Sequence, residues 1–96
     1  MTRNRVSAAE IKAICDTLTA KFHVFEGTTT TVCALFMGDG WMLATGTSAC
    51  VAAANFDEQL GRDIAYGEAM QTAINKLWEL EGYLLKQELN DDHSDT

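Results

Sequence analysis

The segment Gly46-Thr47-Ser48-Ala49-Cys50 is the part of the chain that comes nearest to a catalytic motif. A serine on a tight turn between two glycines, with a histidine as its base, gives a nucleophilic hydroxyl in α/β-hydrolases. Here the second glycine is missing, and the only histidines are His23, near a predicted helix end, and His93, in the C-terminal tail. We therefore interpret this segment as the end of a β-strand.

The three cysteines, Cys15, Cys33 and Cys50, are the other possible nucleophiles. A catalytic thiol needs an electropositive setting and a base that orients it, and an acidic chain supplies neither. Their spacing fits no metal-binding motif, and their odd number fits no closed disulfide framework. We expect small buried side chains in a reducing cytosol, no catalytic residue and no enzymatic activity.

Four acidic residues at the start of a predicted long helix could bind a hard cation. They are Asp57, Glu58, Asp63 and Glu68. Their spacing fits no known cation-binding loop, and capping and solvation of the helix explain them more simply, so we expect no metal and no cofactor. The same acids are candidates for binding a protein partner. Trp41 is a further candidate, because large aromatic side chains dominate interfaces as well as cores.

The net charge of −7 is concentrated in the second half of the chain. Residues 1–50 contain four acids and four bases, whereas residues 51–96 contain ten acids and three bases. Because like charges repel phosphate groups, we expect no direct binding to nucleic acid or to anionic lipid. The acidic half suits a basic protein surface, although a solvated helix face explains the same charge.

Length and composition predict a single folded domain over residues 1–96. Hydrophobic residues make up 47% of the chain and proline is absent, which is typical of a compact fold. No apolar run approaches the roughly 20 residues that span a bilayer. The N-terminus has no apolar segment of the kind found in secretory signals, so we expect no membrane association and a cytoplasmic location.

The predicted fold class is α+β, and its first element is a helix. Ser7 and Glu10 have the spacing of a capping box, in which each satisfies a backbone donor of the other. Apolar residues then recur at helical spacing, which predicts an amphipathic helix over about residues 8–21. The elements after it are a small antiparallel sheet, a long helix and a short C-terminal helix.

The sheet is centred on a predicted hairpin over about residues 30–50. Residues 30–37 and 41–51 are rich in strand-forming side chains, and Gly38-Asp39-Gly40 supplies the positive φ angles of a tight turn. A short strand at Val24 and Phe25 precedes the hairpin. Gly46 marks a bulge or a close approach of another backbone.

A long helix is predicted over about residues 56–78, capped by Asn55, and a short one over about residues 79–89. Residues 90–96 form an acidic tail that we expect to be disordered. One face of the long helix carries small residues four apart, which fits packing against the sheet of the same chain or, less simply, against a second subunit. These residues are Gly61, Ala65, Ala69 and Ala73.

A homodimer is predicted because the hairpin supplies more apolar surface than two helices can cover. The contact would use either the hairpin face or the strip of small residues. The candidate dimer residues are Leu35, Met37 and Leu43 on the hairpin and Gly61, Ala65, Ala69 and Ala73 on the helix.

Four short sequences connect this chain to known proteins. S-A-C-V begins at Ser48, N-F-D at Asn55, G-R-x-I-A-Y at Gly61 and W-x-L-E-G-Y-L-L-K at Trp78. Together they resemble a family of small tailed-phage proteins, typified by gene product 49 of phage N4 and gene product 66 of phage Sf6. Members of that family commonly have proline where this chain has Glu79, which implies a helix break after Trp78. Because this chain lacks that proline, the alternative is a helix that runs on to Leu89 with a weak point at Gly82.

The resemblance implies a phage accessory protein of unassigned activity, present in the cytoplasm of the infected bacterium. Small acidic phage proteins without a catalytic site commonly act by occupying a host protein. Our hypothesis is a host-protein inhibitor, for example of a defence nuclease or a CRISPR complex whose basic surface it masks. Two alternatives remain: an oligomer that sequesters a small nucleotide signal, or a structural or regulatory subunit of a phage complex.

Overall fold

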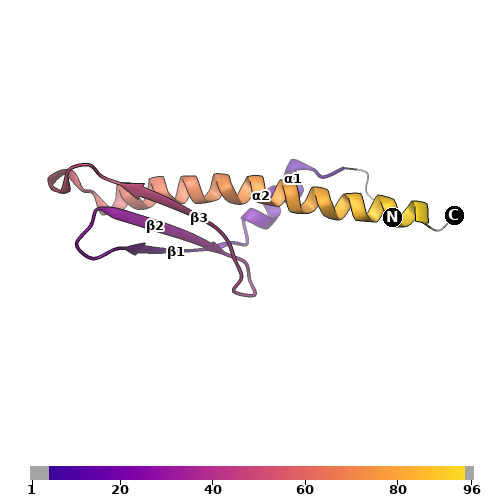
Figure 1. The fold of residues 1–96 in the computed structure, drawn as a ribbon, viewed down its shortest axis with the longest axis horizontal. Coiled ribbons are helices and arrows are strands. Elements are labelled where there is room, and N and C mark those ends of the chain that lie inside the picture. The colour runs from indigo at the N-terminus through magenta and orange to yellow at the C-terminus, as the bar shows by residue number, and fades with distance from the viewer. Residues whose placement is uncertain (1–4, 95–96) are drawn as a thin grey trace.

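Three strands and two helices make up the protein in a computed structural model that describes residues 5–94. The elements are α1 (Ala8–Cys15), β1 (Thr19–Val24), β2 (Thr30–Phe36), β3 (Met42–Ala49), a 3-10 turn (Ala53–Asn55) and α2 (Glu58–Ser94). The strands form one antiparallel sheet in the order β1-β2-β3. One face of the sheet packs against α2 (Figure 1). The predicted α+β class is confirmed.

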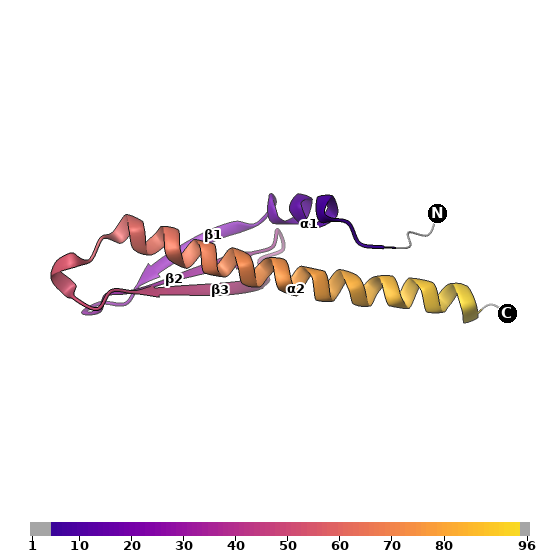
Figure 2. The same ribbon diagram turned by 90° about the horizontal axis from the view of Figure 1, so that it is seen from above.

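The molecule is elongated because α2 is much longer than the strands (Figures 1 and 2). Its extents are 66 × 22 × 18 Å and its radius of gyration is 17.8 Å, whereas a compact domain of this length would have roughly 12–13 Å. The strands and α1 lie along the first part of α2, and the rest of the helix extends past them. About half of α2 therefore lacks a sheet beneath it.

The first helix begins where the sequence predicts but ends earlier. The backbone N–H of Glu10 donates to Ser7 Oγ at 3.2 Å, so this cap is confirmed. The helix stops at Cys15 instead of continuing to residue 21. Thr17 Oγ1 donates to the carbonyl of Ile14 at 2.6 Å and closes the last turn. Residues 19–24 are then free to pair with β2, so the first strand is longer and earlier than the predicted one at Val24 and Phe25.

The hairpin prediction is confirmed for β2 and β3, with changes in detail. Only Gly40 in the turn has a positive φ, at 89°, and Trp41 N–H donates to Asp39 Oδ1 at 3.0 Å. The bulge lies between Leu35 and Phe36, where the register passes over Leu43. Gly46 is therefore not a bulge.

Gly46 is the point of closest approach between the sheet and α2. A Cβ atom at this position would overlap backbone atoms of Ala65 and Ala69. Ala65, Ala69 and Ala73 are fully buried, so the strip of small residues packs on the sheet of its own chain. Of the two contacts predicted for this strip, the structure shows packing against the sheet of the same chain.

The residues predicted for a dimer contact lie mostly in the core of the chain itself. Leu35 and Leu43 are 1% exposed, Gly61, Ala65, Ala69 and Ala73 are buried, and Met37 packs against the same core. All of them except the half-buried Met37 are covered by the sheet or by α2 of the same chain. The homodimer itself stays a prediction.

The long helix has a different start and no break. Asp57, not Asn55, caps it: the backbone N–H groups of Gln59 and Leu60 donate to Asp57 Oδ1 at 2.9 and 3.2 Å. The helix runs without interruption through Trp78–Glu79, because Glu79 keeps the backbone donor that a proline would remove. It also includes residues 90–94, where we expected a disordered tail, while residues 95–96 lie outside the described part.

Candidate functional site

The four acidic residues predicted to bind a protein partner each make a hydrogen bond or an ion pair within the chain. Asp57 caps α2, Glu58 lies 3.4 Å from Arg62, and Asp63 accepts a hydrogen bond from Gln59. Glu68 accepts the backbone N–H of Thr47 in β3 at 3.4 Å. Among the described residues, no group of three His, Cys, Asp or Glu side chains could hold a metal ion. These acids stabilise the start of α2 and its contact with the sheet.

Trp41 lies away from these acids. It precedes β3, whereas the acids follow the other end of that strand. Lys76 Nζ lies 5.5 Å from the centre of its ring and donates to the carbonyl of Leu43 at 3.1 Å. Trp41 is about half exposed. The structure therefore does not assemble the predicted partner-binding residues into one surface.

Among the side chains that the structure describes, Ser48 is not paired with a histidine base. Ser48 and His23 lie on opposite faces of the sheet, since His23 is in register with Val32 and Val32 with Thr47. All three cysteines are free thiols. Burial raises the pKa of Cys15 and of Cys33, which favours the unreactive thiol over the thiolate.

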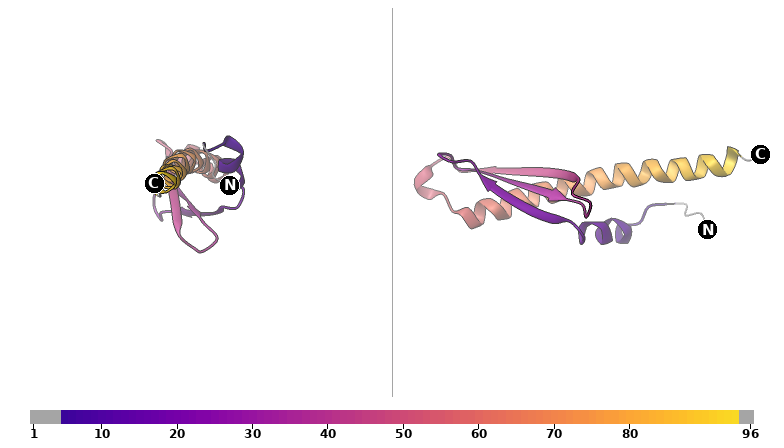
Figure 3. Two further views of the ribbon diagram at one scale, coloured as in Figure 1. Left: turned by 90° about the vertical axis from the view of Figure 1, so that its right-hand side faces the viewer. Right: turned by 90° about the horizontal axis from the view of Figure 1, so that it is seen from below.

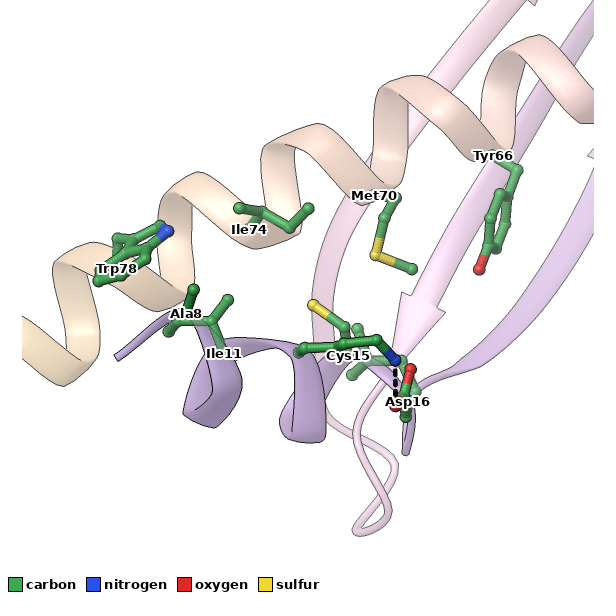
Figure 4. Close-up of a pocket in the computed structure, with 10 residues that line it drawn as sticks. Ala8, Ile11, Cys15, Asp16, Tyr66, Met70, Ile74 and Trp78 are labelled. Atoms are coloured by element: carbon green, nitrogen blue, oxygen red, sulfur yellow. Dashed lines mark hydrogen bonds and ion pairs between the residues drawn. The ribbon is translucent and has the colours of Figure 1, made fainter. Parts of the chain in front are cut away.

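An open groove of about 570 Å³ lies between α1 and α2 (Figure 4). Its walls are mainly apolar, with Ile11 and Leu18 on one side and Met70, Ile74 and Trp78 on the other. At its rim, Lys12 donates to Asp16 at 2.9 Å. This hydrogen bond and the charge of Asp16 raise the pKa of Lys12. Lys12 therefore stays charged and pairs with Asp16, while the walls of the groove suit apolar groups.

Most of the exposed large apolar side chains of α2 lie on what we call the projecting segment, residues 78–90. It follows Lys76, whose side chain makes the hydrogen bond to β3, and it extends beyond the sheet (Figures 1 and 2). Five large apolar side chains on it are between 37% and 61% exposed, namely Trp78, Leu80, Tyr83, Leu84 and Leu89. Glu79, Glu81 and Glu88 outnumber Lys86, so the segment is acidic as well as apolar.

The projecting segment was missed in the prediction of site residues. Trp78 and Tyr83 stand out in the sequence as large aromatic residues, but a helix break after Trp78 would fold the following residues back onto the domain. The available signal was the uninterrupted helix-forming stretch W-E-L-E-G-Y-L-L-K, which contains no proline. Its single glycine, Gly82, weakens the helix without ending it.

Comparisons with known proteins give one match. Neither the curated proteins nor the solved structures include one that matches this chain. No helix within residues 5–94 is long and apolar enough to cross a membrane. A family model matches residues 1–89, which is nearly the whole chain and includes all four short sequences noted above. The chain therefore belongs to the phage protein (N4 Gp49/phage Sf6 gene 66) family.

Proposed function

We propose that this phage protein is a non-enzymatic binding protein that acts on a host protein in the cytoplasm of the infected bacterium. The observation that carries the proposal is the projecting segment, in which an acidic helix exposes two aromatic and three leucine side chains. Aromatic side chains of this kind supply most of the free energy at protein interfaces. Leu80, Tyr83 and Leu84 have the i, i+3 and i+4 spacing of the anchors used in helix-in-groove docking.

The size of the exposed surface indicates what else the interaction needs. The five side chains leave roughly 400 Å² uncovered, which at about 25 cal/mol per Å² corresponds to at most about 10 kcal/mol, because one groove covers only one side of the helix. Association itself costs about 4–15 kcal/mol. Because these two quantities are similar, apolar burial alone does not secure a stable complex, and complementary charge must add to it.

The charge of the segment defines the partner. Three glutamates and one lysine favour a groove lined by apolar side chains and rimmed by lysine or arginine. Basic surfaces of this type are common on proteins that handle nucleic acids. A defence nuclease or a CRISPR complex is therefore our specific candidate for the target, and the protein would inhibit it by masking the basic surface.

The nucleotide sequestrant is less well supported. Its site would need unpaired cations or amides, whereas the groove between α1 and α2 is mainly apolar and its lysine is paired with Asp16. A structural or regulatory role in a phage complex would use the same projecting segment with a phage partner. The experiment below separates these outcomes by the origin of the captured protein.

Affinity capture from a lysate of phage-infected host cells tests the proposal with two matched variants. Tyr83→Ala/Leu84→Ala alters the projecting segment, whereas Leu60→Ala/Ile64→Ala removes equally exposed apolar side chains from the start of α2. We expect the wild type and the second variant to retain one stoichiometric host protein, and the first variant to lose it. Capture should also weaken as salt increases, since it depends on charge. Capture of no host protein, or equal capture by both variants, would contradict the proposal.

A further inference from the structure

The two outer strands of the sheet have different edges. The edge of β3 is closed by side chains of α2: Glu68 accepts the N–H of Thr47, and Lys76 donates to the carbonyl of Leu43. Within residues 5–94, the outward-facing edge of β1 has no such cover. β1 runs along the side of the sheet away from α2, which packs on β2 and β3 (Figures 1 and 3). One edge is thus protected and the other is available for pairing.

The hydrogen-bond pattern shows which groups β1 presents at its free edge. The N–H of Phe25 donates to the carbonyl of Thr30 at 3.3 Å, so these two residues form a hydrogen-bonded pair. Such pairs recur every second residue in an antiparallel ladder. The backbone groups of Lys21 and His23 therefore point toward β2. Those of Ala20, Phe22 and Val24 point outward.

Independent support for this assignment comes from the opposite edge. Val32 is in register with both His23 and Thr47. If Val32 bonds toward β1, then Thr47 must point away from β2. Thr47 N–H does point outward, because it donates to Glu68. The same alternation therefore accounts for both edges of the sheet.

We propose that the free edge of β1 pairs antiparallel with β1 of a second copy, giving a continuous six-stranded sheet with its two-fold axis at Phe22. In this register Phe22 faces Phe22 of the other copy, and Ala20 faces Val24. All three outward-pointing residues of each strand then find a partner, giving about six backbone hydrogen bonds. A shift by two residues loses two of these bonds, so the symmetric register is favoured.

The side chains of β1 fit pairing with a copy of itself. Phe22 is 41% exposed on the face of the sheet that carries α2, where no helix covers β1. Cross-strand pairing of the two rings would bury both. The strand also lacks the usual protection against pairing, since it contains no proline, is continuous in register with β2 and has one charged residue, Lys21.

Electrostatics favour this edge over the other surfaces as a contact between copies. A net charge of −7 makes two copies repel one another in most orientations. β1, β2 and β3 contain no aspartate or glutamate. Contact through β1 keeps the acidic α2 helices apart and leaves both projecting segments free. The dimer is thus independent of the proposed host interaction.

Light scattering at tens of micromolar tests the oligomeric state directly. We expect a dimer for the wild type and for Phe25→Lys, a control at an exposed phenylalanine beyond the end of β1. Phe22→Lys should weaken dimerisation at least tenfold while the far-ultraviolet circular dichroism stays unchanged. A monomeric wild type, or a dimer that Phe22→Lys does not weaken, would overturn the proposal.

Amide hydrogen exchange provides a second test that needs no variant. The amides of Lys21 and His23 should be protected at every concentration, because they bond to β2. Those of Phe22 and Val24 should become protected only as the protein concentration rises into the dimer range. If Phe22 exchanged at the unprotected rate in samples shown to be dimeric, the contact would lie elsewhere and the proposal would fail.

Discussion

The two halves of α2 have opposite surroundings although they belong to one helix. The first half presents alanines and a glycine to the sheet and is fully buried along that face. The second half, the projecting segment, carries tryptophan, tyrosine and leucine in solvent. Small residues therefore mark the contact of α2 with the sheet, and large exposed residues beyond the sheet mark the surface that we assign to a partner.

The covered half should be most sensitive at Gly46. We expect Gly46→Ala to cost about 3 kcal/mol or more, because the added Cβ overlaps backbone atoms of Ala65 and Ala69 that cannot move independently. Chemical denaturation measures the effect. Gly38→Ala is the control, since open space surrounds that position. Equal stabilities for these two variants would show that the sheet and the helix do not meet as described.

A second variant tests the same contact from the side of the helix. Ala69→Leu should cost about 1–3 kcal/mol through overpacking. Because the contact lies within one chain, this loss should not depend on protein concentration. Gln71→Leu, at an exposed position on the same helix, should change stability by less than about 0.5 kcal/mol. If the loss of stability in Ala69→Leu depended on protein concentration, the strip of small residues would lie at an interface between subunits.

The cap of α2 discriminates between the sequence prediction and the structure. Asp57→Ala should cost about 1 kcal/mol, because two backbone N–H groups lose their acceptor. Asn55→Ala should have little effect, since Asn55 lies in the preceding 3-10 turn. Unfolding in denaturant compares the stabilities of the two variants. A larger loss of stability for Asn55→Ala would show that Asn55, and not Asp57, caps the helix.

The smallest change in stability is expected in the projecting segment, where the substitution should stabilise the protein instead of destabilising it. Gly82→Ala should stabilise that part of α2 by about 0.5–1 kcal/mol, because alanine has the higher helix propensity and the site is open. Helical content measured by circular dichroism should rise slightly. A loss of helicity would indicate that Gly82 is a true break in the helix.

Local signals in the sequence predicted much of the fold. The hairpin followed from strand-forming residues around a glycine turn, the first helix start from Ser7 and Glu10, and the strip from small residues four apart. The end of α1 could not be predicted in this way. Leu18 and Phe22 continue the helical period, and only pairing of β1 with β2 converts that stretch into a strand.

The projecting segment was harder to predict, because its exposure depends on whether other helices or strands cover it. The sequence shows that residues 78–89 are rich in large apolar side chains, but it does not show whether other elements cover them. A break after Trp78 would bury them, and a continuous helix exposes them. The acidic residues at the start of α2 are exposed and also make contacts within the chain, so their role in binding a partner stays a prediction.

The distance between spin labels at Gln59 and Gln87 tests the central claim most directly. Both positions are exposed on α2 and are 28 residues apart. A continuous helix predicts a single narrow distribution near 42 Å, from a rise of about 1.5 Å per residue. Labelled protein diluted with unlabelled protein removes any contribution from a dimer. A distance of about 20 Å would show that α2 breaks after Trp78 and folds back, and it would contradict a projecting segment.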